Sequence, residues 1–325
     1  MKTYGLPYKG SKDKIADKIC SLFPIKENFY DLFMGGGSIT HYQLLQNQYK
    51  NYYANDFNPL VVKAFDMAIH GKFKNETRWI SHEEFDKLKN VDPYVAFCFS
   101  FGNDLRSYAY GEDVEPYKKA LHYAIIFQKY DLLNKIFNDI DFTFLDKFND
   151  SNERRLKLQQ FMKRNNLGYN TPIETCVKIS EISQNVKNLN SLNQLENNEK
   201  YQSLSQLKSC QQLLNFERLK IYNKSYDEIE IKPNSVIYCD IPYKSTNKYE
   251  VSKDFDYEKF YDWCEKQTEL CFISEYDMPR DRFTCIAEIE HRSIICANEN
   301  QSVIERVFLP NHQTKDYKIP SLFDM

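Results

Sequence analysis

The sequence predicts an α/β fold in which a Rossmann-like sheet carries a mainly helical insertion. Short apolar stretches that are typical of strands alternate with helix-like stretches at both ends of the chain. The middle of the chain shows helical periodicity without strand alternation. Three consecutive glycines (Gly35, Gly36 and Gly37) directly follow the first apolar stretch, which indicates a strand, a turn and a helix at a ligand-binding edge.

The first 60 residues predict a helix followed by a strand-helix-strand unit. Residues 12–23 have apolar side chains at helical spacing. A strand over 28–33, a helix over about 38–47 and a strand over 52–55 follow, and Asp56 comes directly after the second strand. In such units an acid at this position lies at the same sheet edge as the turn after the first strand.

Strand patterns resume near the end of the chain. Five stretches are expected to be strands: 219–223, 236–240, 270–274, 283–290 and 302–309. A helix is expected over 256–270. We therefore predict one discontinuous domain, residues 1–60 and 205–325, with a second domain, residues 61–204, inserted in it.

Composition and cysteine spacing indicate a globular cytoplasmic protein. Of the 325 residues 42% are hydrophobic, so the chain can bury a core. No apolar run approaches the roughly 20 residues needed to cross a bilayer, and the N-terminus lacks the apolar core of a signal peptide. Nine cysteines without a CxxC pair favour reduced thiols over disulfides or zinc. We expect neither a metal nor a membrane contact.

The net charge of -3 gives no general attraction to nucleic acid, so any such contact needs a local basic patch. Between Ser151 and Asn190 there are seven Lys or Arg and three acids, which gives 7 - 3 = +4. This patch predicts contacts to phosphates. A solvated helix face is the other interpretation.

The glycine turn and Asp56 are candidates for binding a nucleoside-type cofactor. Consecutive glycines let the backbone approach a ligand, and the next helix presents N–H groups to a carboxylate or phosphate. The pattern is neither GxGxxG nor GxxxxGK(S/T), which disfavours a dinucleotide and a phosphate-loop nucleotidase. Asp56 either accepts hydrogen bonds from ribose hydroxyls or caps a helix before Pro59.

The residues Asp240, Ile241, Pro242 and Tyr243 follow an apolar stretch, so Asp240 is expected at the carboxyl edge of a central strand. The exocyclic amine of a base is a weak nucleophile because its lone pair is delocalised into the ring. The Asp240 carboxylate and the Ile241 carbonyl would hold both amine hydrogens, and Tyr243 would stack on the base. The other interpretation is an acid and a proline that only end a strand.

These motifs and their order resemble the Dam-like class of N6-adenine DNA methyltransferases. Residues 7–12 (PYKGSK) resemble the first cofactor motif of that family, and 31–38 (DLFMGGGS) its methionine-binding turn. Residues 240–243 (DIPY) resemble its catalytic motif. The resemblance implies a class I methyltransferase sheet that is mostly parallel with one antiparallel strand. It also implies that the discontinuous domain binds S-adenosylmethionine and catalyses, while the insertion recognises double-stranded DNA.

Single residues acquire expected roles from this resemblance. S-adenosylmethionine, with S-adenosylhomocysteine as product, would be bound by Tyr8, Lys12, Asp31, Phe33, Gly35, Gly37, Ser38, Asp56, Phe57, Ser225 and Tyr226. Catalysis would rest on Asp240, Ile241, Pro242 and Tyr243, which direct the methyl group to a flipped adenine. Asn103 and Arg106 would approach the DNA, and charge adds Arg154, Arg155, Lys163 and Arg164 as phosphate contacts.

Two positions depart from the family pattern. Ile241 stands where the family has a proline, so the fixed φ is lost while the carbonyl stays available as an acceptor. Ser225 stands where relatives carry Asp, so one hydrogen bond is possible without a charge.

Two other functions are compatible with these motifs. One is methylation of another amine, on N4 of cytosine, on RNA or on a protein glutamine, although Asp at the head of 240–243 favours adenine. The other is DNA binding without catalysis. A solitary enzyme and the modification half of a restriction system are both possible, and a cognate restriction endonuclease would be a separate protein.

Overall fold

A seven-stranded sheet is the centre of the computed structural model, which describes residues 4–138, 140–168, 216–243, 255–292, 302–315, 317 and 318. The strands are β1 (Asn28–Asp31), β2 (Asn51–Asn55), β3 (Leu219–Tyr222), β4 (Ser235–Asp240), β5 (Leu270–Glu275), β6 (Phe283–Arg292) and β7 (Ser302–Pro310). Their order is β3-β2-β1-β4-β5-β7-β6. All neighbours are parallel except β7, which is antiparallel to both β5 and β6. The prediction of a mostly parallel sheet with one antiparallel strand is confirmed.

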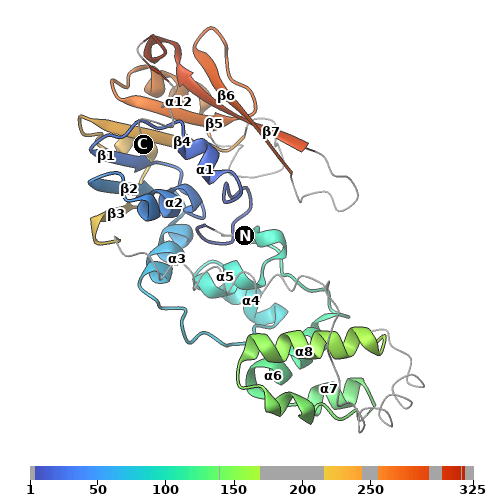
Figure 1. Ribbon diagram of the computed structural model, residues 1–325. Coiled ribbons are helices and arrows are strands. Elements are labelled where there is room, and N and C mark those ends of the chain that lie inside the picture. Colours follow the sequence, from blue (N-terminus) through green and yellow to red (C-terminus); the bar gives the residue numbers. More distant parts are fainter. Residues whose placement is uncertain are drawn as a thin grey trace.

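The described residues also form helices (Figure 1). They are α1 (Ala16–Cys20), α2 (Ser38–Gln46), α3 (Pro59–Ile69), α4 (His82–Leu88), α5 (Pro93–Phe99), α6 (Glu115–Phe127), α7 (Asp131–Ile136), α8 (Ser151–Arg164) and α12 (Tyr257–Glu265). Short 3₁₀ turns are η1 (Phe101–Asn103), η2 (Thr143–Lys147), η4 (Phe216–Arg218), η5 (Tyr226–Glu228) and η6 (Asn311–Gln313). The strands predicted for both ends of the chain agree with these bounds, whereas the helix predicted over 12–23 is only one short turn of helix.

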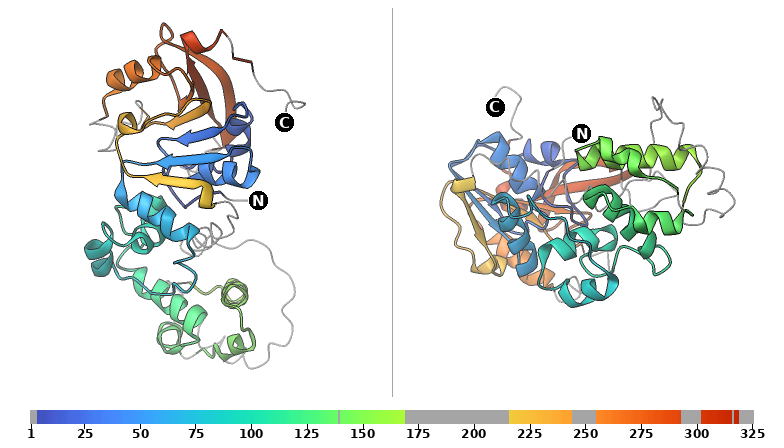
Figure 2. Two further views of the ribbon diagram at one scale, coloured as in Figure 1. Left: turned by 90° about the vertical axis from the view of Figure 1, so that its left-hand side faces the viewer. Right: turned by 90° about the horizontal axis from the view of Figure 1, so that it is seen from below.

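Alternation along the strands gives the sheet two buried faces (Figure 2). Phe29 and Tyr52 belong to the apolar cluster that α1, α2 and α3 cover. The next residues along these strands, Tyr30 and Tyr53, belong to the cluster that α12 covers. Because both faces are buried, the middle residues of β1, β2, β4 and β5 are apolar, which is usual for parallel sheets.

The carboxyl ends of the central parallel strands meet at one edge of the sheet. Asp31 and Asp240 are the last residues of β1 and β4, and Asp56 follows the end of β2. Strand β1 lies between the other two strands. Three acids that are far apart in the sequence therefore share the edge at which open α/β sheets bind ligands.

The helical insertion has an apolar core of its own at the end of the molecule opposite the sheet (Figure 1). This core is formed by α6, α7, η2 and α8. Helices α3 and α5, in contrast, contribute Phe65 and Phe97 to the same buried cluster as the sheet. The predicted boundary at residue 60 separates α3 from the strands on which it packs, so we propose a boundary closer to residue 115. The boundary predicted between residues 204 and 205 lies outside the described residues.

Replacing Gly37 should destabilise the protein more than replacing another glycine with positive φ. Gly37 has φ +70°, and a Cβ there would collide with the ring of Phe65. Gly37→Ala should lower the free energy of unfolding by about 2–4 kcal/mol through backbone strain and overpacking. Gly102→Ala also has positive φ, but no atom lies within 4 Å of its added Cβ, so it should cost only about 1–2 kcal/mol. Equal losses in urea unfolding would contradict this packing.

Candidate active site

The glycine turn after β1 is held by Asp56. The Gly35 N–H donates to Asp56 Oδ2 at 2.8 Å, and the Asn58 N–H donates to Asp56 Oδ1 at 2.8 Å. Burial raises the pKa of Asp56, although these two hydrogen bonds oppose the shift. The helix cap before Pro59 is Asn58, whose side chain accepts from the Leu60 N–H. Asp56 thus fixes the turn and does not cap α3.

Only one of the two oxygens of the buried Asp31 carboxylate has a hydrogen-bond partner among the described residues. Its Oδ2 accepts a hydrogen bond from the Thr40 hydroxyl at 2.7 Å, while Oδ1 is buried with no described partner. Burial raises the pKa of Asp31 to about 7, with Asp240 and Asp56 adding to the shift. A buried carboxylate oxygen without a donor is suited to a cationic ligand.

The N-terminal segment crosses the glycine turn. The Leu6 N–H donates to the Gly36 carbonyl at 2.6 Å, and the Lys12 N–H donates to Ser38 Oγ at 3.2 Å. A Cβ on Gly36 would lie 2.7 Å from Cβ of Tyr8, so only glycine lets this segment approach so closely. Burial and the charge of Asp56 raise the pKa of Tyr8, whereas the nearby Arg106 acts in the opposite direction. Four predicted cofactor positions therefore lie together: Tyr8, Lys12, Gly35 and Ser38.

Asp240 forms a bidentate ion pair with Lys12. Lys12 Nζ lies 2.8 Å from both carboxylate oxygens of Asp240. Burial would lower the pKa of Lys12, but Asp240 and Glu305 outweigh it and raise that pKa. Burial raises the pKa of Asp240 to about 6, with Lys12 opposing and Glu305 adding to the shift. The motif at residues 7–12 and the motif at residues 240–243 thus meet at one charge pair.

Tyr243 and Glu305 complete this cluster. The Tyr243 hydroxyl donates to Glu305 Oε1 at 2.6 Å and lies 3.3 Å from Asp240 Oδ1. Lys12 Nζ lies 4.9 Å from the centre of the Tyr243 ring, and the Tyr276 ring packs 4.5 Å from it. Glu305 was not among the predicted site residues. The signal that could have found it is an acid at an alternating strand position whose neighbours two residues away, Val303 and Val307, are apolar.

The backbone after Asp240 keeps an acceptor despite the Ile241 substitution. The Tyr257 hydroxyl donates to the Pro242 carbonyl at 2.8 Å. Within the described residues no donor is bonded to the Ile241 carbonyl, and the Ile241 side chain is buried among the residues under α12. The Ile241 side chain is therefore part of the core.

Aromatic residues line the sheet edge beyond the glycine turn. Phe33 and Tyr226 stack with ring centres 5.5 Å apart, and Phe260 packs against both. Phe57, which directly follows Asp56 in the sequence, is 76% exposed. The Ser225 hydroxyl bonds to the Asp227 carboxylate, which also pairs with Lys259 at 2.6 Å. Asp227 thus places an acid beside Ser225, a feature that the sequence interpretation missed.

The model of the D12 class N6 adenine-specific DNA methyltransferase family matches residues 8–275. The chain belongs to this family. The matched range contains the glycine turn, Asp56 and Asp240, and it ends at the last residue of β5. The chain is therefore an adenine-specific DNA methyltransferase, and the resemblance inferred from the sequence is confirmed. None of the curated proteins matches it.

The basic side chains of this methyltransferase differ in their surroundings. Arg106, Lys163 and Arg164 are exposed, and Arg155 is half-buried. The Asn103 side-chain amide donates to the Phe97 carbonyl at 3.1 Å.

Arg154 requires a correction. Its guanidinium is buried and donates to the carbonyls of Ile125, Phe148 and Asn149 at 2.6–2.9 Å. These bonds tie α8 to the end of α6, so the structure contradicts the predicted phosphate contact. Counting charge along the sequence could not separate this side chain from its exposed neighbours.

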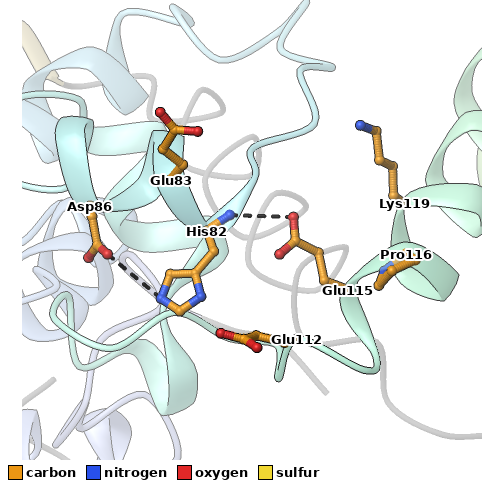
Figure 3. A pocket seen from close by; sticks show the side chains of 7 residues that line it. All are labelled: His82, Glu83, Asp86, Glu112, Glu115, Pro116 and Lys119. Atoms are coloured by element: carbon orange, nitrogen blue, oxygen red, sulfur yellow. Dashed lines mark hydrogen bonds and ion pairs between the residues drawn. The ribbon is translucent and has the colours of Figure 1, made fainter.

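A cavity of about 600 Å³ lies between α4 and α6 (Figure 3), and none of its lining residues belongs to the Asp240 cluster. It is lined by His82, Glu83, Asp86, Glu112, Glu115, Pro116 and Lys119. His82 Nε2 lies 3.7 Å from Asp86 Oδ2, and the His82 N–H donates to Glu115 Oε1. Four acids at its wall disfavour DNA, and no group of described side chains there has the arrangement of a metal site.

None of the described helices is long and apolar enough to cross a membrane.

Asp31 should make this methyltransferase less stable as the pH rises from about 4 to about 7. In this window the unfolded chain releases the Asp31 proton while the folded protein retains it, so stability falls as pH rises. Asp31→Asn has no titratable group at this position. The difference in unfolding free energy between this variant and wild type should therefore shift in favour of the variant by up to about 4 kcal/mol from the low end to the high end of the window. Urea unfolding at about pH 4 and about pH 8 measures the gain, with the exposed Asp17→Asn as control. A difference that is constant with pH would contradict the raised pKa.

Proposed function

We propose that the chain transfers the methyl group of S-adenosylmethionine directly to N6 of a flipped adenine in double-stranded DNA and releases S-adenosylhomocysteine. The observation that carries this proposal is the pair of acceptors at the end of β4, the Asp240 carboxylate and the Ile241 carbonyl, beside the glycine turn. The family implies a methyl donor of this kind and a DNA substrate.

The residues at the sheet edge are compatible with this cofactor. The unpartnered oxygen of Asp31 suits the ammonium of the methionine part, and the Gly35 and Gly37 backbone leaves room for it. Tyr8, Lys12 and Ser38 surround the same turn. Each Asp56 oxygen has a second lone pair for a ribose hydroxyl.

The adenine of the cofactor would lie at the aromatic part of the edge. Phe57 exposes most of its ring, and Phe33 packs on Tyr226. Ser225 would only accept a hydrogen bond there, because its hydroxyl proton is already donated to Asp227.

When bound, the cofactor supplies a sulfonium methyl group for in-line transfer. Asp240 and the Ile241 carbonyl would accept the two N6 hydrogens, which favours a nitrogen with an available lone pair. Tyr243 would stack on the flipped base. The methylated nitrogen must lose one proton, and the Asp240 carboxylate can accept it because its pKa is raised to about 6.

Positive side chains of the helical part would hold the DNA. Arg106 lies near Tyr8 and so near the site, while Lys163 and Arg164 extend from the end of α8. Phosphate contacts from these residues and Arg155 would help to offset the few kcal/mol that flipping a base costs. Asn103 would approach the DNA from the same loop. The insertion is thus the proposed recognition domain, while a separate restriction endonuclease and a cytoplasmic location stay predictions.

Replacing Asp240 should abolish adenine methylation. Purified protein is incubated with labelled S-adenosylmethionine and unmethylated genomic DNA, and the labelled nucleoside is identified after digestion. Label should appear in N6-methyladenine, and Asp240→Asn should reduce the rate about 100-fold or more. The exposed Asp262→Asn serves as control.

Label in cytosine, or none on any DNA, would contradict the proposal. The first result would indicate N4 chemistry, and the second another substrate or a protein that only binds DNA.

Removing single exposed cations should weaken DNA binding without changing sequence preference. Arg106→Ala, Lys163→Ala and Arg164→Ala should each reduce the slope of log K against log salt by about 1. Fluorescence anisotropy over a salt series measures the slope. Lys87→Ala, which removes an exposed lysine paired with Glu83 on α4, is the control. A slope unchanged in all three variants would show that DNA binds elsewhere.

A further inference from the structure

A second buried carboxylate, Glu305, adjoins Asp240. Glu305 lies on β7 and is 2% exposed. Its Oε1 accepts the Tyr243 hydroxyl at 2.6 Å and lies 4.0 Å from Lys12 Nζ. The residue follows the range that the family model matches.

The position of Glu305 is one that an apolar side chain would ordinarily fill. Residues 305, 307 and 309 point to the same face of the strand, and Val307 and Leu309 are fully buried. A buried carboxylate is unfavourable unless it is paired and hydrogen-bonded. The partners of Glu305 are both residues of the proposed active site, Tyr243 and Lys12, so its burial is linked to that site.

Lys12 and the target amine compete for one carboxylate. Lys12 Nζ bonds both oxygens of Asp240, one of which the amine would need. Withdrawal of the ammonium would free both oxygens of Asp240 for the amine. Movement toward Glu305 would keep the ammonium paired with a carboxylate.

We propose that Glu305 is a positioning residue for methyl transfer: it receives the Lys12 ammonium and anchors the Tyr243 hydroxyl, so that Asp240 is released to hold the target amine. This inference rests on the proposed function. Glu305 acts through Lys12 and Tyr243 and does not itself contact the adenine.

Glu305→Gln keeps the shape of the side chain and removes its charge. Lys12 then stays on Asp240, and the single-turnover methylation rate should fall about tenfold or more, as expected for loss of a charged hydrogen-bond partner. Binding of S-adenosylhomocysteine and of DNA should stay within about twofold of wild type. Glu288→Gln, an exposed residue of the same β6-β7 hairpin that pairs with Arg306, is the matched control.

The pH profile distinguishes positioning from a structural role. Loss of the Glu305 charge removes one cause that raises the pKa of Asp240, so the acidic limb of the kcat/KM profile should move to lower pH. Among the residues that the structure describes, the titratable groups that interact with Asp240 are Tyr8, Lys12, Asp31, Tyr238, Cys239, Tyr243, Tyr276 and Glu305. Only the last of these changes in the variant.

A Glu305→Gln protein with wild-type rate and pH profile would overturn the inference. If this variant unfolds, Tyr243→Phe decides: a several-fold slower rate at an unchanged melting temperature supports anchoring by Glu305, and a wild-type rate overturns it. A wild-type protein that methylates no adenine would overturn the proposed function and this inference together. An active wild type with an unaffected Glu305→Gln would overturn the inference alone.

Discussion

The ion pair between Lys12 and Asp240 is the contact on which the candidate active site depends. It joins the N-terminal segment to the end of β4 across 228 residues of sequence. Both side chains are largely buried, and removing one partner of such a pair typically costs about 3–5 kcal/mol. The pair therefore holds the N-terminal segment against the end of β4. The proposed target amine would use the same carboxylate, so Lys12 and the amine would share one acceptor.

The two partners of this pair lie on either side of the insertion in the sequence. Residues 7–12 and the glycine turn come before it and β4 comes after it, yet β1 and β4 are neighbours in the sheet. After β2 the chain continues into α3 and α5, which share a buried cluster with the sheet. Helices α6–α8 then form a separate core. Arg106 lies between these parts and near Tyr8. A single DNA duplex that places one base at Asp240 can thus contact the helices with its sugar-phosphate backbone.

Local patterns predicted much of the fold and part of the site. Apolar runs marked the strands, and parallel pairing then brought Asp31, Asp56 and Asp240 to one edge. Features that depend on tertiary contacts escaped prediction. Arg154 is buried because three carbonyls surround it. Glu305 reaches the site only through the antiparallel register of β5 and β7. Helix α3 looked like part of the insertion, because nothing in its sequence shows that Phe65 packs on Gly37.

The most direct test of this account is a crystal structure of the protein with S-adenosylhomocysteine and a duplex that contains its recognition site. The account predicts that N6 of a flipped adenine lies within hydrogen-bond distance of the Asp240 carboxylate and the Ile241 carbonyl. Lys12 Nζ should have left Asp240 for Glu305. A flipped adenine held by other groups, with Lys12 still bonded to both oxygens of Asp240, would contradict it.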